Sequence, residues 1–124
     1  MDALIIEPSK NTPGINFSLD GHMIIKGRSL PGNSNEFYTP IIDWASSITI
    51  EAIKLDIFLE YINSSSAKKI LEFLKVLDAN CNIKEFNVNW YYEEDDEDSL
   101  ESGQLLEELL GRARFLFFKF SETA

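Results

Sequence analysis

Three consecutive serines, residues 64–66, stand where an alternating apolar segment gives way to a helical pattern. One side chain at such a junction caps the helix, and Asn63, Ser64 or Ser65 could do so. The other serines are then either small residues of a tight turn or hydroxyls that can accept a phosphate. A phosphate adds about −1.5 to −2 charges and three acceptor oxygens, and the free amides of a helix start bind such a group.

Two lysines favour the phosphate interpretation. Lys68 and Lys69 lie in the first helical turn, where each cation faces the positive end of the helix dipole at a cost of roughly a few tenths of a kcal/mol. Such a placement suits a helix start that carries an anion part of the time. The predicted site comprises Ser64 as acceptor, Ser65 and Ser66 as helix caps or substitute acceptors, and Asn63 and Lys68 beside the phosphate. Because a phosphate is locally favourable here, it should alter a contact surface rather than the fold.

Six consecutive carboxylates, residues 93–98, form a second feature that could carry chemistry. Their spacing lacks the central glycine and terminal glutamate of an EF-hand calcium loop, so we predict no metal site. A solvated loop is the plain alternative, with Asp98 and Glu101 as a capping box for the next helix. Aromatic residues directly before the run favour a protein-docking patch. The candidate contact residues are Tyr38, Trp90, Tyr91, Glu93, Glu94, Asp95 and Asp96.

Catalysis finds weaker support in the sequence. His22 is the only histidine, it lies beside a predicted hairpin turn, and no nucleophile-elbow motif accompanies it. The stretch GRSLPGN lacks the Lys-Ser/Thr ending of a phosphate-binding loop, and Cys81 has no motif around it. A metal-dependent phosphohydrolase that uses the acidic run is the least favoured alternative. We therefore predict a protein that is not an enzyme and that needs no cofactor.

The elements that position these residues follow from hydrophobic periodicity. Apolar runs at 15–19 and 22–27, separated by Asp20-Gly21, predict a hairpin. Thr39-Pro40 predicts the cap and first position of a short helix that reaches residue 48. Further along, the patterns predict strands at 53–61, 83–92 and 114–120, a helix over 67–77 that stops at Asn80, and a helix over 104–110 that Gly111 ends. The last strand is apolar on both faces, which predicts an inner position in the sheet.

This order of elements predicts an α/β fold. Strand–helix–strand units favour parallel pairing with right-handed crossovers, and the leading hairpin makes the sheet mixed. We predict a single layered domain over residues 1–124, with a mixed, mostly parallel β-sheet, an N-terminal hairpin and about three helices.

Composition limits the class of partner. The 124 residues are 44% hydrophobic, enough for a core, and carry a formal net charge of −10, which disfavours nucleic acid and anionic membranes. The start MDALIIEPSK has no basic lead, and no apolar run approaches the ~20 residues of a membrane span, so we predict neither a signal peptide nor membrane insertion. Cys81 is the only cysteine, which favours the reducing cytoplasm.

The serine stretch and several other blocks resemble one family. NSSSAKKIL, shortly after LEY, is similar to the YFNTSSSK signature of the SiaC family of bacterial regulatory phosphoproteins. The similarity extends, in the family's order and over nearly the whole chain, to TPGINF at 12–17, GRSLPGN at 27–33, FYTP at 37–40 with Trp44, and WYYEEDDEDS at 90–99.

The resemblance implies a partner-switching protein of cyclic-di-GMP signalling with a biofilm-type output. A dedicated Ser/Thr protein kinase would phosphorylate Ser64, which occupies the position of the family's phosphorylated threonine, and a PP2C-type phosphatase would remove the phosphate. The unmodified form would bind and activate a diguanylate cyclase, a GGDEF protein. The implied fold resembles that of the anti-sigma-factor antagonists (STAS-like). A phosphoregulated anti-sigma-factor antagonist in a different circuit is the alternative.

Overall fold

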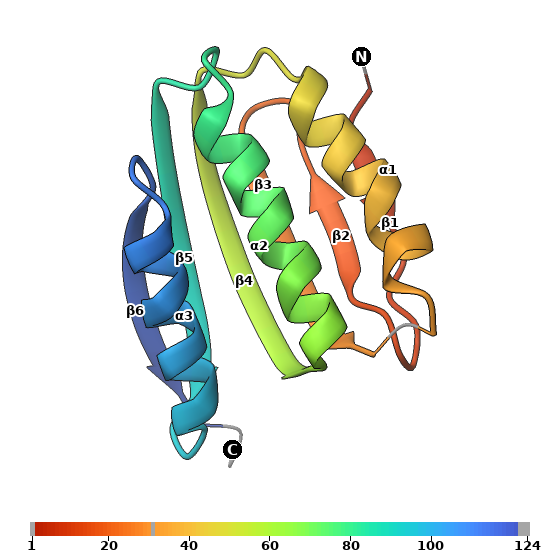
Figure 1. Cartoon of the computed structure of the whole chain (residues 1–124), viewed down its shortest axis with the longest axis vertical. Coiled ribbons are helices and arrows are strands. Elements are labelled where there is room, and N and C mark those ends of the chain that lie inside the picture. The colour runs from red at the N-terminus through yellow and green to blue at the C-terminus, as the bar shows by residue number, and fades with distance from the viewer. Residues whose placement is uncertain (1, 31, 122–124) are drawn as a thin grey trace.

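A six-stranded mixed sheet with α1, α2 and α3 on one face forms the framework of the protein, in a computed structural model that describes residues 2–30 and 32–121 (Figure 1). The strands follow one another across the sheet in chain order. The elements are β1 (Leu4–Ile6), β2 (Gly14–Phe17), β3 (His22–Ser29), α1 (Ser34–Ser47), β4 (Ala52–Ile62), α2 (Ser64–Ala79), β5 (Glu85–Glu93), α3 (Glu97–Leu109) and β6 (Arg114–Phe120).

Strand direction divides the sheet into two parts. The strands β1, β2 and β3 pair antiparallel, whereas β3, β4, β5 and β6 pair parallel. The predicted mixed, mostly parallel α/β fold is therefore confirmed. Each helix follows the carboxyl end of a parallel strand, so α1, α2 and α3 all begin at the same edge of the sheet, the lower edge in Figure 1. The serines and the acidic run both lie at this edge.

Alternation along the strands separates a buried face from an open one. In β4, Ile53, Leu55 and Ile57 are buried beneath the helices, and the side chains between them point to the helix-free face. Each buried aliphatic side chain contributes about 1.5–3 kcal/mol relative to exposure. This burial fixes the register of β4 and so fixes the point at which α2 can begin.

The predicted hairpin joins β2 and β3. Its turn requires Gly21, which has a φ of 99° and whose added Cβ would lie 2.1 Å from the carbonyl oxygen of Ala52. The Asp20 carboxylate accepts a hydrogen bond from the His22 amide at 2.9 Å and closes the turn. The prediction of a hairpin at Asp20-Gly21 is confirmed.

The predicted start of the first helix is wrong. The helix begins at Ser34 rather than at Pro40, because the Asn33 side chain caps it by accepting a hydrogen bond from the Glu36 amide at 3.1 Å. Pro40 lies inside the helix, where it cannot donate to the Glu36 carbonyl. The burial of Tyr38 in the core stabilises the extra turns.

The predicted inner position of the last strand is also wrong, because β6 is an edge strand. The apolar residues on the two faces of β6 have different roles. Phe115 belongs to the core and the partly buried Phe117 packs against it beneath α3, whereas Leu116 and Phe118 lie exposed on the helix-free face. There Phe118 stacks on Tyr91 with a centroid distance of 5.0 Å, which extends an aromatic row from Phe58.

Candidate functional site

Asn63 caps α2. Its Oδ1 accepts a hydrogen bond from the Ser66 amide at 2.8 Å and another from the Ser65 hydroxyl at 3.2 Å. The amides of Ser64 and Ser65 donate no hydrogen bond within the described ranges, as is usual for the first positions of a helix. The helix is therefore capped without any serine hydroxyl, and the backbone amides of Ser64 and Ser65 remain as unbonded donors at its start.

The three serines of α2 lie in three different environments. Ser66 is fully buried, and its hydroxyl accepts a hydrogen bond from Ser29 at 2.8 Å. Ser65 is exposed, but its hydroxyl also lies 2.7 Å from the hydroxyl of Ser34 at the start of α1. Ser64 is exposed, and its hydroxyl makes no hydrogen bond with the residues that the structure describes. Of the three, Ser64 presents the hydroxyl that a kinase can most readily reach.

The prediction that Ser66 could cap the helix or substitute as the acceptor is wrong. Its hydroxyl belongs to a buried polar cluster in which Ser29 hydrogen-bonds both Ser66 and the Tyr38 phenol. Burial raises the pKa of Tyr38, so the phenol stays neutral. The cluster joins α1, β3 and α2 directly behind the start of α2. Tyr38 is 1% exposed and thus also departs from its predicted place on a contact surface.

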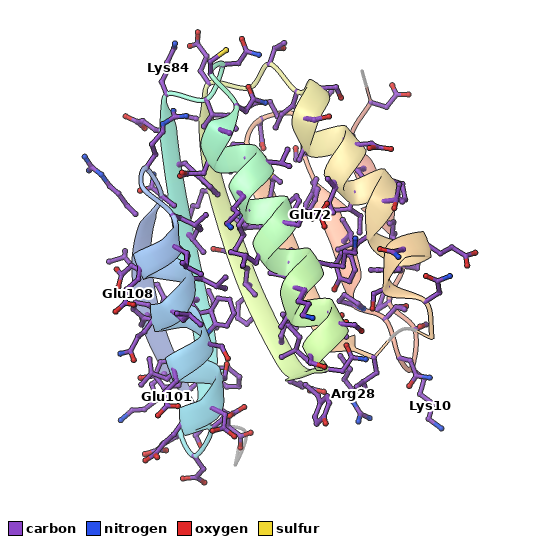
Figure 2. The ribbon with its side chains drawn as sticks, in the orientation of Figure 1. Lys10, Arg28, Glu72, Lys84, Glu101 and Glu108 are labelled. Atoms are coloured by element: carbon purple, nitrogen blue, oxygen red, sulfur yellow. The ribbon has the colours of Figure 1, made fainter. Side chains whose placement is uncertain are left out.

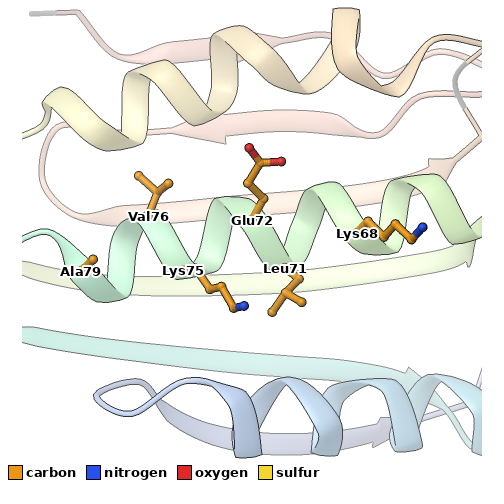
Figure 3. Close-up of a pocket in the computed structure, with 6 residues that line it drawn as sticks. All are labelled: Lys68, Leu71, Glu72, Lys75, Val76 and Ala79. Atoms are coloured by element: carbon orange, nitrogen blue, oxygen red, sulfur yellow. The ribbon is translucent and has the colours of Figure 1, made fainter.

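The two lysines of the first turns have different roles. Lys69 pairs with Glu72 at 3.1 Å. Lys68 makes no ion pair in the part of the chain that the structure describes, and it lies one helical turn after Ser64. Its side chain points toward the beginning of α2 (Figure 3). Lys68 is therefore the cation available to a phosphate on Ser64.

The last three residues of the acidic run form the cap and the first turn of α3. The Asp96 carboxylate accepts a hydrogen bond from the Ser99 amide at 3.0 Å, so the cap lies two residues before the predicted Asp98. This earlier start places Glu97 and Asp98 in the first turn, where carboxylates favour the helix dipole. Asp96 and Asp98 also line a hollow of about 270 Å³ with residues 59–62, the end of β4. The acidic run thus lies beside the segment that leads into Ser64.

The predicted aromatic docking patch is divided by the sheet. Trp90 is buried on the helix side, where its indole donates to the Ser99 carbonyl at 3.0 Å. Tyr91 lies on the helix-free face, stacked between Phe58 and Phe118. Trp90 and Tyr91 therefore cannot share one contact surface, which corrects that part of the prediction. Glu93, Glu94 and Asp95 are exposed.

Metal ligands and membrane-spanning helices were both sought among the residues that the structure describes. Within residues 2–30 and 32–121, no three His, Cys, Asp or Glu side chains gather as metal ligands. None of the described helices is long and apolar enough to cross a membrane. Sequence reasoning missed Ser29 and Ser34, whose hydroxyls hold Ser66 and Ser65. The signal for them was their place in and directly after the block GRSLPGN.

Comparison with known proteins decides the family. The family model described as SiaC family regulatory phosphoprotein matches residues 6–120. The chain belongs to the SiaC family. It is similar in structure to SiaC of Pseudomonas aeruginosa, with a TM-score of 0.84 and 26% sequence identity over 97% of this chain and 100% of that one. The predicted family, its regulatory phosphoprotein class and its fold are confirmed.

A further structure that contains SiaC, and one further relative of this SiaC-family chain, come from the same bacterium. The crystal structure of the diguanylate cyclase SiaD in complex with its activator SiaC contains a chain that matches with a TM-score of 0.82, at 26% identity over 94% of this chain and 99% of that one. An uncharacterized protein of Pseudomonas aeruginosa is 30% identical over 98 residues, which are 75% of this chain and 78% of the relative.

Proposed function

We propose that this SiaC-family protein binds and activates a diguanylate cyclase while Ser64 is unmodified and releases the cyclase when Ser64 carries a phosphate. The observation that carries the proposal is the Ser64 hydroxyl, exposed and without a hydrogen-bond partner among the described residues, at the capped start of α2. The similar SiaC that is an activator of the diguanylate cyclase SiaD supports the choice of partner.

The phosphorylation step needs only an accessible hydroxyl. A Ser/Thr protein kinase transfers the γ-phosphoryl group of ATP to the Ser64 oxygen, the P–O bond to ADP breaks, and the hydroxyl proton leaves to the kinase's base. A PP2C-type phosphatase reverses the modification by hydrolysing the ester with water. Once attached, the phosphate lies near the two unbonded amides of Ser64 and Ser65 and one turn from Lys68. The switch therefore changes the charge of a docking surface and leaves the fold intact.

We also propose that the protein regulates without catalysing a reaction itself. The His22 imidazole lies 2.9 Å from the Asp56 carboxylate, which Asn89 also binds at 2.8 Å, and this group lies on the helix-free face. The sheet thus separates the imidazole from the serines of α2. The cytoplasm is the proposed compartment, because the ATP of the kinase and the GTP of the cyclase are both available there.

Phosphosite mapping together with a cyclase assay tests the proposal. Incubation with the cognate kinase and ATP should add one phosphate, which is lost in Ser64→Ala and retained in the matched control Ser65→Ala. Unmodified protein and Ser64→Ala should both raise cyclic-di-GMP synthesis by the cyclase, and kinase treatment should abolish activation by the wild type alone. A phosphate mapped to another residue would refute the assigned acceptor. Full activation by the phosphorylated protein would refute the switch.

A further inference from the structure

An apolar groove runs between α2 and α3 on the helix side of the sheet. Ala67 and Leu71 line it from α2, Leu105 and Leu109 line it from α3, and Trp90 lies at its base. Its volume is about 190 Å³. Leu105 and Leu109 are 56% and 48% exposed, respectively, an unusual exposure for leucines that point toward a neighbouring helix. We call this feature the α2–α3 groove.

Ser64 lies one helical turn before Lys68, which lines the α2–α3 groove. Ser64, Lys68, Leu71 and Lys75 recur at spacings of four, three and four residues, which places them along one side of α2. In Figure 3 the side chains of Leu71 and Lys75 point from α2 toward α3, and Lys68 points toward the start of the helix. A phosphate on Ser64 would therefore stand on the α2 rim of the groove.

The two rims of the groove carry opposite charge. Lys68 lines the groove from α2, and the exposed Lys75 points from α2 toward α3 in Figure 3. On α3 the exposed carboxylates Glu101 and Glu108, both labelled in Figure 2, stand four residues before and three residues after Leu105 and so neighbour it on the helix surface, and the exposed Asp98 stands one turn before the groove residue Ser102. None of these five side chains makes an ion pair with another residue in the described ranges. A ligand that complements the groove must therefore be apolar in the middle, acidic on one flank and basic on the other.

We propose that the α2–α3 groove binds an amphipathic helix of the partner, with its acidic flank toward Lys68 and Lys75 and its basic flank toward α3. The proposal rests on the proposed function, since the partner is the cyclase. A helix fits because the groove is mostly apolar and offers polar side chains only at Lys68 and Ser102 among the residues that line it, so an extended segment would bury most of its backbone groups unpaired. A helix satisfies its own backbone.

The length of the groove sets the number of contacts. Ser102 and Leu109 mark its extent along α3, and seven residues rise about 10 Å, close to two helical turns. The partner helix is thus anchored by apolar residues at positions i, i+3 or i+4, and i+7. A phosphate on Ser64 binds Lys68 and repels the acidic flank, so it expels the helix while the groove keeps its shape.

A pair of matched variants tests the location. Leu105→Asp places a charge in the groove, and Leu116→Asp places the same charge at a leucine 61% exposed on the helix-free face. Calorimetric titration of the unphosphorylated chain with the diguanylate cyclase should show binding at least about tenfold weaker for Leu105→Asp and within about twofold of wild type for Leu116→Asp. A circular dichroism spectrum and a cooperative thermal unfolding transition like those of the wild type verify that Leu105→Asp is folded.

The outcomes separate the two proposals. Failure of the wild type to bind the cyclase refutes the proposed function. If the wild type and Leu105→Asp bind the cyclase with equal affinity, the groove is not the docking site, and the proposed function still stands. The charge assignment is tested in the same titration, where Lys75→Glu should weaken binding at least about tenfold and Lys75→Arg should not. A loss of affinity in both variants, or in neither, overturns the assigned orientation of the flanks.

Photo-crosslinking tests the conformation of the ligand. A photoreactive group attached to Lys75→Cys, in a Cys81→Ser background because Cys81 is exposed, labels the bound cyclase. Crosslinked residues three or four positions apart support a helix. Residues two positions apart would mean an extended strand, and crosslinks to a second copy of this chain would mean a self-interface, and either result overturns the proposal.

Discussion

A negative charge at position 64 should stabilise this protein slightly. Ser64 is the first residue of α2, where the amides of Ser64 and Ser65 have no described acceptor and where Lys68 lies one turn ahead. Replacement of Ser64 by Asp removes no hydrogen bond, because none of the described residues bonds the hydroxyl. The same substitution at Ser47, the last residue of α1, places the carboxylate at the negative end of a helix.

The expected changes in the free energy of unfolding are small, because positions 64 and 47 are both exposed. A carboxylate in the first turn contributes about 0.3–1 kcal/mol through the helix dipole, and its pairing with Lys68 adds about 0.3–0.5 kcal/mol. Ser64→Asp should therefore raise stability by about 1 kcal/mol, which is about 4 °C in Tm for a chain of this size. Ser47→Asp should lower stability by a similar amount, because it meets the opposite end of a dipole and loses the bond from Ser47 to the Trp44 carbonyl.

Thermal unfolding followed by circular dichroism measures both variants beside the wild type. Because the contributions are electrostatic and exposed, the difference in Tm between Ser64→Asp and Ser47→Asp should shrink in 1 M NaCl, where the Debye length is about 3 Å. A Tm for Ser64→Asp several degrees below wild type would refute the reasoning, since it would mean that the charge disturbs the fold itself. A difference that persists unchanged in high salt would exclude the helix dipole as its cause.

Three other substitutions probe the scaffold around the site. Ser66→Ala removes the acceptor of the buried Ser29 hydroxyl and should lower the free energy of unfolding, measured by thermal unfolding, by about 1–3 kcal/mol. The kinase should still phosphorylate Ser64 in this variant. Gly103→Ala should lower Tm, because the added Cβ would lie 2.9 Å from ring atoms of Trp90 and Phe117. The overpacking costs about 1–3 kcal/mol, which exceeds the gain in helix propensity of about 1 kcal/mol. Gly111→Ala is the control, because a Cβ added there would have nothing within 4 Å. Tyr38→Phe should be less stable at pH 7, yet its stability should fall less steeply above pH 10. Burial holds the wild-type pKa of Tyr38 above its ordinary 10.0, so the unfolded chain releases that proton first, and a denaturant titration at pH 10–11 that shows equal slopes would contradict this.

The middle of the fold could be predicted because its signals are local. Alternation over 53–61 and helical spacing over 67–77 follow directly from which side chains must reach the core, and β4 and α2 contain both ranges. The position of β6 at the sheet edge depends on pairing with β5, which no local pattern encodes. The start of α1 depends on a side-chain cap at Asn33 and on the burial of Tyr38, which outweigh the preference of proline for a first turn.

The site was predictable in part for similar reasons. The acceptor at Ser64 came from the helix start and from the family resemblance, and it stays a prediction. The burial of Ser66 in α2 depends on Ser29, which lies in the strand β3 and 37 positions away in the chain. The separation of Trp90 from Tyr91 was available from the sequence, because neighbouring residues of a strand point to opposite faces. The α2–α3 groove required coordinates, since helical spacing alone places Leu105 and Leu109 beside the core face.

The affinity of the diguanylate cyclase for this protein, measured for the unmodified form and for the form phosphorylated at Ser64, tests the proposed switch most directly. Calorimetric titration at equal ionic strength should give saturable binding for the unmodified form and binding at least about tenfold weaker for the phosphorylated form. Equal affinities for the two forms would contradict the claim that a phosphate at the start of α2 controls docking.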